Sequence, residues 1–195
     1  MDTRQLTTSD GHELTADVGT PNGESVAGVV VCHPHPLYGG NRFNPVVEAV
    51  CSRLMAAGCT ALRFDFRSDH GGGDAEVLDI VAALDHLDDA LPDVPLAVIG
   101  YSFGAAVALR TADERIVALA AIAPPLTMME APAPTQPTLV LTPRHDQFSD
   151  ADAVAPIVAE WHQTSFEVIE STDHFLAGSI DSVAARVVNW LTATT

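Results

Sequence analysis

The chain has 195 residues, of which 47% are hydrophobic, and its nine basic residues, all arginine, face 26 acidic ones, giving a formal net charge of −17 at pH 7. A chain of this length and composition suits one domain with a sizeable core, which we expect to span residues 1–195. The strong negative charge argues against nucleic acid and against an anionic membrane surface as partners.

Targeting signals and cysteines indicate the cellular compartment. The N-terminal residues lack the apolar core of a signal peptide, and the longest apolar segments are only as long as a strand. Cys32, Cys51 and Cys59 are an odd number of cysteines in apolar segments, which is typical of reduced core thiols. We therefore expect a cytoplasmic protein without a membrane span.

The N-terminal region is expected to be antiparallel. Residues 5–18 read as two short strands around Asp10 and Gly11, a dipeptide suited to a two-residue hairpin turn. After a turn at residues 21–24, the pattern changes to a continuous β-branched run at residues 26–32. Such a run is typical of a strand that is buried on both faces of a parallel sheet.

Strands and helices are then expected to alternate along the chain. Further strands are expected at residues 59–66, 96–100, 116–123, 138–141 and 166–169. Helices are expected at residues 43–57, 74–89, from 103 onward, 151–161 and 179–191. The connection at 124–137 is proline-rich and too short for a folded cap.

This alternation predicts the fold class α/β. We expect a doubly wound, mostly parallel sheet with helices on both faces, joined by right-handed crossovers and without a cap domain. Ligands of such sheets bind beyond the carboxyl ends of the strands, and His33, Ser102, Asp146 and His174 all fall there.

The segment around Ser102 carries the strongest chemical signal. An apolar run ends at Gly100, and an alanine-rich run of helical type starts at Phe103, so the serine sits at a strand-to-helix turn. Glycine two positions to either side fits a turn in which strand and helix approach closely. Ser102 is therefore the candidate nucleophile.

A serine hydroxyl needs a base, and the base needs an acid that fixes its tautomer. In this fold the acid follows a later strand, and the histidine comes near the end of the chain. His174 lies in a loop between the last strand and the last helix, whereas His162 lies at the end of a helix. His174 is the preferred base.

Asp146 is the preferred acid, because it lies just past the expected strand at residues 138–141. Asp150 and Asp152 are better placed to cap the next helix. Asp173 remains an alternative, as an acidic residue beside the base.

Histidines near the same edge also permit a metal interpretation. His33, His35, Asp69 and His70 could be ligands, as could the pair formed by His145 and its neighbour. No spaced pair on a helix supports this interpretation, so we expect no metal.

A serine nucleophile also requires an oxyanion hole, meaning two N–H groups that bind the developing negative charge. The N–H of Phe103, at the start of a helix, is one candidate. The second should come from the loop after residues 26–32. Pro34 and Pro36 have no N–H, so the donor is His35, Leu37 or a residue just beyond.

Three arginines fall near the expected site. Arg42, Arg67 and Arg144 could form a positive rim that binds a substrate carboxylate or phosphate. The alternative is structural: each could pair with an acid or brace a loop. Other candidates for contacting the substrate are Tyr38, Tyr101 and Met128.

Taken together, the motifs at residues 33–40 (HPHPLYGG), 62–67 (LRFDFR) and 100–104 (GYSFG) resemble the α/β-hydrolase superfamily. The resemblance is closest to small, lidless hydrolases near dienelactone hydrolase and the serine peptidase-type esterases. It covers nearly the whole chain and implies a triad of Ser102, Asp146 and His174 with no cofactor. Dienelactone hydrolases carry a cysteine where this chain has Ser102.

The leading hypothesis is a serine hydrolase that cleaves a small carboxylic ester or thioester through an acyl-enzyme. A peptidase or amide hydrolase with the same triad is the nearest alternative. A non-catalytic binding protein of the same fold is a third, and it predicts a broken triad. The sequence leaves the oligomeric state open.

Overall fold

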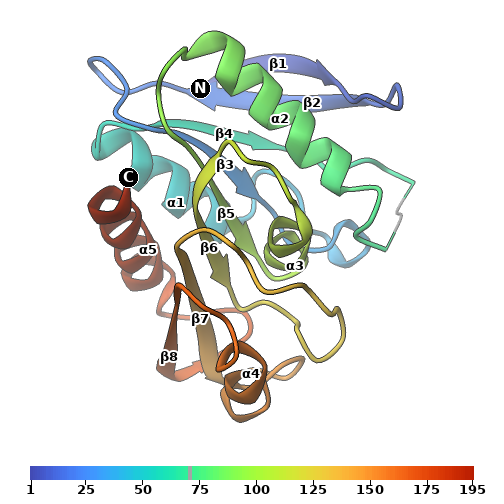
Figure 1. The fold of residues 1–195 in the computed structure, drawn as a ribbon, viewed down its shortest axis with the longest axis vertical. Coiled ribbons are helices and arrows are strands. Elements are labelled where there is room, and N and C mark those ends of the chain that lie inside the picture. The colour runs from blue at the N-terminus through green and yellow to red at the C-terminus, as the bar shows by residue number, and fades with distance from the viewer. Residues whose placement is uncertain (70–71) are drawn as a thin grey trace.

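A single eight-stranded sheet organises the computed structural model, which describes residues 1–69 and 72–195. The strands lie in the order β1-β2-β4-β3-β5-β6-β7-β8, from the top to the bottom of Figure 1. Their bounds are β1 Asp2–Thr7, β2 Glu13–Gly19, β3 Gly28–Cys32, β4 Thr60–Phe64, β5 Leu96–Tyr101, β6 Ile116–Ile122, β7 Thr138–His145 and β8 Thr164–Asp173. The six strands from β4 to β8 in this spatial order, β3 included, are parallel to one another. At one edge of the sheet β2 pairs antiparallel with β4, and β1 pairs antiparallel with β2.

The central strands are buried along their whole length. Every residue of β3, β4 and β5 is buried, as expected for parallel strands that are covered on both faces. This burial explains their continuous apolar sequences and confirms the predicted α/β class with a mostly parallel sheet.

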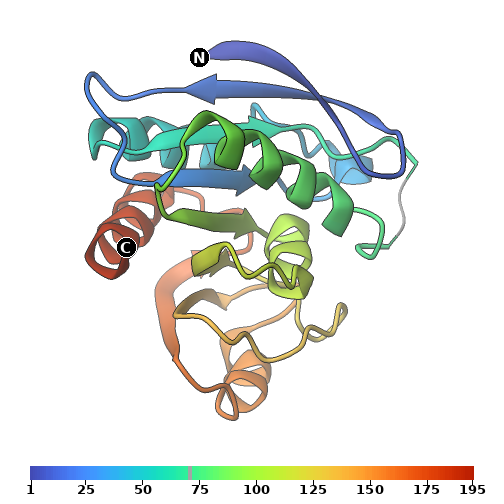
Figure 2. The ribbon, with the colours of Figure 1, turned by 45° about the horizontal axis from the view of Figure 1, so that its top comes forward.

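Helices cover both faces of this sheet (Figure 2). Their bounds are α1 Pro45–Ala56, α2 Val77–Ala90, α3 Phe103–Arg110, α4 Ala151–Val158 and α5 Ile180–Thr194. The helices α2, α3 and α4 pack their apolar side chains on one face, and α1 and α5 pack on the other. Among the helices of the described residues, none is both long and apolar enough to cross a lipid bilayer.

The expected N-terminal hairpin is present, but its turn is longer than predicted. β1 ends at Thr7 and β2 begins at Glu13, so residues 8–12 form the connection. The backbone N–H of His12 binds the Thr8 hydroxyl, and Gly11 adopts a φ of 88°. The connection is longer because the Gly11 N–H closes a turn onto the Thr8 carbonyl, and the Thr8 N–H donates to the His12 carbonyl. Asp10, within this turn, also binds Arg67.

The cysteines and the last strand can also be compared with what the sequence predicts. Cys32, Cys51 and Cys59 are buried and form no disulfide, as predicted. Burial raises the pKa of the Cys32 thiol, so this residue is unsuited to act as a nucleophile. β8 extends well beyond the expected 166–169, because its register with β7 continues to Asp173.

Candidate active site

Ser102 occupies a strained turn between β5 and α3. Its φ of 55° lies in the left-handed region that residues with a side chain rarely adopt. Gly100 and Gly104 make the turn possible: a Cβ at Gly100 would lie 2.3 Å from the Gly104 carbonyl oxygen, and one at Gly104 would lie 2.6 Å from the His33 carbonyl oxygen. The Ser102 N–H also binds the Ile122 carbonyl at the end of β6. The turn is thus held by the close approach of β5 and α3 and by a hydrogen bond to the end of β6.

The structure brings the predicted acid, base and nucleophile into one hydrogen-bonded chain. Ser102 Oγ lies 2.8 Å from His174 Nε2, and His174 Nδ1 lies 2.7 Å from Asp146 Oδ2. The other Asp146 oxygen accepts hydrogen bonds from the N–H groups of Phe148 and Ser149. All three residues of the chain are buried or nearly so. The carboxylate therefore fixes the ring with its proton on Nδ1 and leaves Nε2 to accept one from the serine.

The alternative acids lie elsewhere. Asp173 accepts a hydrogen bond from the Phe175 N–H through its Oδ1 and is not hydrogen-bonded to the His174 ring. Asp150 caps α4 by accepting from the Ala153 N–H, as predicted. Asp152 instead forms an ion pair with Arg144.

Two side chains hold the backbone of His174. The Tyr101 hydroxyl donates to the His174 carbonyl at 2.8 Å, and the His174 N–H donates to Gln147 Oε1 at 3.3 Å. Burial raises the pKa of Tyr101 to about 12, so the phenol stays protonated and able to donate. Tyr101, predicted to contact substrate, therefore holds the backbone of His174 in place. Gln147 was missed, although it directly follows the predicted acid.

His33 organises the loop after β3. Its Nδ1 donates to the Pro34 carbonyl at 2.6 Å, and its Nε2 accepts from the Phe66 N–H at 3.0 Å. Burial lowers the pKa of His33 to about 4, so the ring is neutral near pH 7. Because the C=O and N–H of one trans peptide point in opposite directions, the next N–H, that of His35, points away from His33.

The candidate oxyanion donors differ in their environment. Phe103 is the first residue of α3, where backbone N–H groups have no partner within the helix. His35 lines the cavity in front of Ser102. Leu37 does not fit the prediction: its N–H donates to His35 Nδ1, and its side chain is 71% exposed on the short 3₁₀ helix Pro36–Tyr38.

An apolar cavity of about 450 Å³ opens in front of Ser102. Its walls come from the loop after β3, the turn at Ser102 between β5 and α3 (the elbow), the 124–137 connection and the loops that carry Asp146 and His174. The lining residues are Pro34, His35, Tyr38, Gly39, Gly40, Asn44, Tyr101, Ser102, Phe103, Pro125, Met128, Met129, Phe148, His174 and Phe175. Tyr38 and Met128, two of the candidates for contacting the substrate, both line this cavity. Phe148 and Phe175 were missed, although both are close neighbours of predicted triad residues.

All three arginines considered for the rim are held in ion pairs. Arg42 binds Asp17 and Asp65, and Arg144 binds Glu170 together with Asp152. Neither arginine lines the cavity. Of the two interpretations left open by the sequence, these contacts favour the structural one for Arg42 and Arg144.

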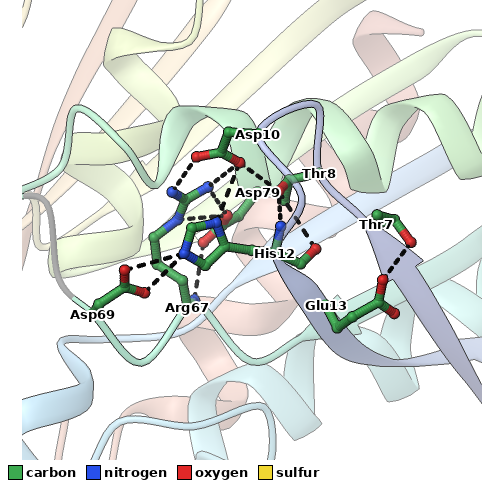
Figure 3. Close-up of polar contacts among 8 residues, drawn as sticks. All are labelled: Thr7, Thr8, Asp10, His12, Glu13, Arg67, Asp69 and Asp79. Carbon is green, nitrogen blue, oxygen red and sulfur yellow. Dashed lines mark hydrogen bonds and ion pairs between the residues drawn. The ribbon is translucent and has the colours of Figure 1, made fainter.

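Arg67 is the third, and it is buried in an ionic cluster (Figure 3). Its guanidinium binds Asp79 of α2 and Asp10 of the hairpin connection, and the backbone N–H of Arg67 also donates to the Asp79 carboxylate. His12 lies beside Asp10 and Asp69 in the same cluster. Arg67 therefore ties the hairpin to α2 and does not face the cavity. It also fixes the segment that supplies the Phe66 N–H to His33.

Replacing Arg67 with methionine should destabilise the fold by about 3–5 kcal/mol, because the fully buried Asp79 carboxylate would lose its cationic partner. Burial already raises the pKa of Asp79, and without Arg67 it should rise further. A carboxyl whose folded pKa exceeds its unfolded value loses stability as the pH rises through the folded pKa. The deficit should therefore be larger at pH 8 than at pH 5, as measured by urea unfolding.

The matched control for that experiment is the double variant Arg67→Met/Asp79→Asn. It removes the buried charge but keeps an oxygen that accepts from the residue 67 N–H. The double variant should recover part of the lost stability and lose most of the pH dependence. An Arg67→Met deficit below about 1 kcal/mol, the range of an exposed pair, would contradict this role.

The metal interpretation gains no support from the described residues. Among residues 1–69 and 72–195, no group of three or more histidine, cysteine, aspartate or glutamate side chains is arranged to hold a metal ion. Both ring nitrogens of His33 are engaged in hydrogen bonds. His70, one of the considered ligands, lies outside the described residues.

Comparisons with known proteins agree with the fold described above. A family model described as "Alpha/beta hydrolase family" matches residues 29–194. An uncharacterized protein from Rickettsia prowazekii is 32% identical over 184 residues, covering 83% of this chain and 77% of the relative. An alpha-beta serine hydrolase homologue from Coxiella burnetii has a TM-score of 0.87 at 25% identity, covering 97% of this chain and 96% of its own. XC6422 from Xanthomonas campestris, an a/b serine hydrolase without a lid, has a TM-score of 0.85 at 28% identity, covering 95% and 90%.

Proposed function

Because the chain belongs to the alpha/beta hydrolase family, we propose that it is a serine hydrolase that cleaves a small carboxylic ester or thioester through an acyl-enzyme. The observation that carries this proposal is the hydrogen-bonded chain from Ser102 through His174 to Asp146. Its order along the sequence and its place at the carboxyl ends of the strands are those of a triad in this fold. A non-catalytic binding protein would not need these three side chains to be hydrogen-bonded to one another in this order.

The proposed reaction has two steps. Ser102 Oγ attacks the acyl carbon while its proton passes to His174 Nε2, and Asp146 stabilises the imidazolium. The bond between the acyl carbon and the alcohol oxygen then breaks, and His174 returns the proton to the departing oxygen. Water attacks the resulting serine ester by the same route in reverse, which releases the acid and restores the hydroxyl.

The oxyanion that forms in each step needs two N–H donors. We assign Phe103 as one, because its N–H begins α3 next to the nucleophile and the helix dipole favours negative charge there. We assign His35 as the other, because it lines the cavity and its N–H points away from His33. Leu37 is left out, since its N–H binds the His35 side chain.

The cysteines bear on the compartment, and the proposed reaction bears on the cofactor requirement. Three unpaired cysteines suit a reducing compartment such as the cytoplasm. The proposed reaction uses only the side chains and backbone groups named above, together with water, so it requires no cofactor.

An acyl-enzyme predicts a constant product ratio. Esters that share an acetyl group but differ in their alcohol should all form the same acetyl-serine, which then divides between water and added methanol in one fixed proportion. We expect phenyl, benzyl and ethyl acetate to give the same ratio of acetate to methyl acetate, measured by gas chromatography. A ratio that changes with the leaving alcohol would indicate direct attack by water. Absence of hydrolysis of all three esters would contradict the proposed function.

A further inference from the structure

The proposed chemistry determines where the alcohol part of the ester must lie. His174 Nε2 takes the Ser102 proton and must later deliver it to the alcohol oxygen. That oxygen therefore has to reach hydrogen-bonding distance of Nε2 while the carbonyl oxygen faces Phe103 and His35. The alcohol part must accordingly leave along the cavity wall that surrounds the His174 ring.

Two phenylalanines form this wall. The Phe148 ring lies edge-to-face with the His174 ring at a centroid distance of 4.6 Å, and the Phe175 ring is similarly oriented at 5.8 Å. Both line the cavity, and they remain 43% and 63% exposed. They come from two different loops: Phe148 lies in the loop that carries Asp146, and Phe175 directly follows His174. Aromatic rings left open to solvent beside a reacting group are well placed to pack against a ligand.

Among the described residues that line the cavity, none is an arginine, aspartate or glutamate. Arg42, Arg67 and Arg144 are all held in ion pairs and do not belong to this lining. A charged alcohol would lose its hydration here without gaining a carboxylate or guanidinium partner, whereas an apolar one would gain contact area.

We propose that Phe148 and Phe175 form the leaving-group subsite, and that it takes an uncharged aryl or arylalkyl alcohol. This inference rests on the proposed function, because it needs Ser102 and His174 in their assigned roles. In the step that concerns it, the bond between the acyl carbon and the alkoxy oxygen breaks, the oxygen keeps the electron pair, and His174 protonates it. The neutral alcohol then departs past the two rings.

Matched esters test this subsite. Benzyl acetate and ethyl acetate share an acyl group and release alcohols of similar acidity, so their ratio of kcat/KM reports contact with the ring. We expect benzyl acetate to be favoured by at least about tenfold in the wild type. Phe148→Ala and Phe175→Ala should each remove most of this preference. The ratio is insensitive to a general loss of activity, because damage to His174 would lower both rates alike.

Two controls sharpen the experiment. Phe43→Ala removes an exposed ring that packs on Arg42 and Arg63 outside the cavity, so it should leave the ratio unchanged. Methyl phenylacetate against methyl propionate places the ring on the acyl side, and neither Phe148→Ala nor Phe175→Ala should alter that ratio.

Each outcome decides a different claim. Equal kcat/KM for benzyl and ethyl acetate, or a preference that survives in both alanine variants, would overturn the subsite and leave the serine mechanism standing. A change confined to the acyl-side pair would assign the two rings to the acyl group and also overturn it. If the wild type hydrolyses neither acetate, the proposed function and the subsite both fail.

Discussion

Replacing Asp146 with asparagine should lower kcat by about ten thousandfold while leaving the fold intact. The carboxylate accepts the Nδ1 proton of His174 at 2.7 Å and so keeps Nε2 free to receive the serine proton. An amide NH₂ in its place favours the opposite tautomer, in which Nε2 already carries a proton. Asparagine keeps an oxygen for the N–H groups of Phe148 and Ser149, so the loop should hold its shape.

The measurement is kcat for phenyl acetate, with circular dichroism as the check on folding. Asp173→Asn is the matched control, because Asp173 lies next to the base in sequence but binds the Phe175 N–H instead of the His174 ring. It should remain within a few-fold of the wild type. A nearly silent Asp146→Asn together with an inactive Asp173→Asn would show that the acid is assigned to the wrong residue.

Short-range patterns in the sequence were sufficient to predict the elbow and the sheet. Glycines two positions to either side of Ser102 report a close approach of strand and helix, which the structure contains. The order of elements after it then limits where an acid and a histidine can follow a strand. This limit selects Asp146 and His174, whose side chains the structure brings within hydrogen-bonding distance of each other. The buried strands were recognisable because parallel strands covered on both faces have continuous apolar sequences.

Features that depend on long-range pairing were predicted less well. The sequence leaves the arginines near the site open to two interpretations, an anion-binding rim and a structural role. Arg42 is in fact bound by Asp17 of β2, and Arg67 by Asp10 of the hairpin connection. No local signal identifies such partners before the strands are assembled.

The cavity wall shows a third kind of limit. Phe148 and Phe175 stand within two residues of predicted triad members, yet sequence alone gives no direction for a loop side chain. Their contacts with His174 depend on how two separate loops fold toward each other. Likewise, the hydrogen bond from the Tyr101 hydroxyl to the His174 carbonyl joins residues far apart in the chain.

Ser102→Ala should show the largest effect of any single change, a loss of about a millionfold in kcat, because no other residue is proposed to attack the ester. Only background hydrolysis supported by the oxyanion donors and binding should remain. Alanine is smaller than serine and meets the same backbone strain, so the elbow should persist. Ser182→Ala is the matched control: its hydroxyl binds the Ser179 carbonyl at the start of α5, far from the cavity lining, and full activity is expected.

The most direct test is to treat the protein with a fluorophosphonate and to locate the adduct by peptide mass spectrometry. Fluorophosphonates react with activated serine hydroxyls and form a stable phosphonate ester. We expect one equivalent of label on the peptide that contains Ser102, loss of ester hydrolysis in step with labelling, and no label on Ser102→Ala. Label on any other residue, or undiminished hydrolysis by the Ser102→Ala variant, would contradict the assignment of Ser102 as the nucleophile.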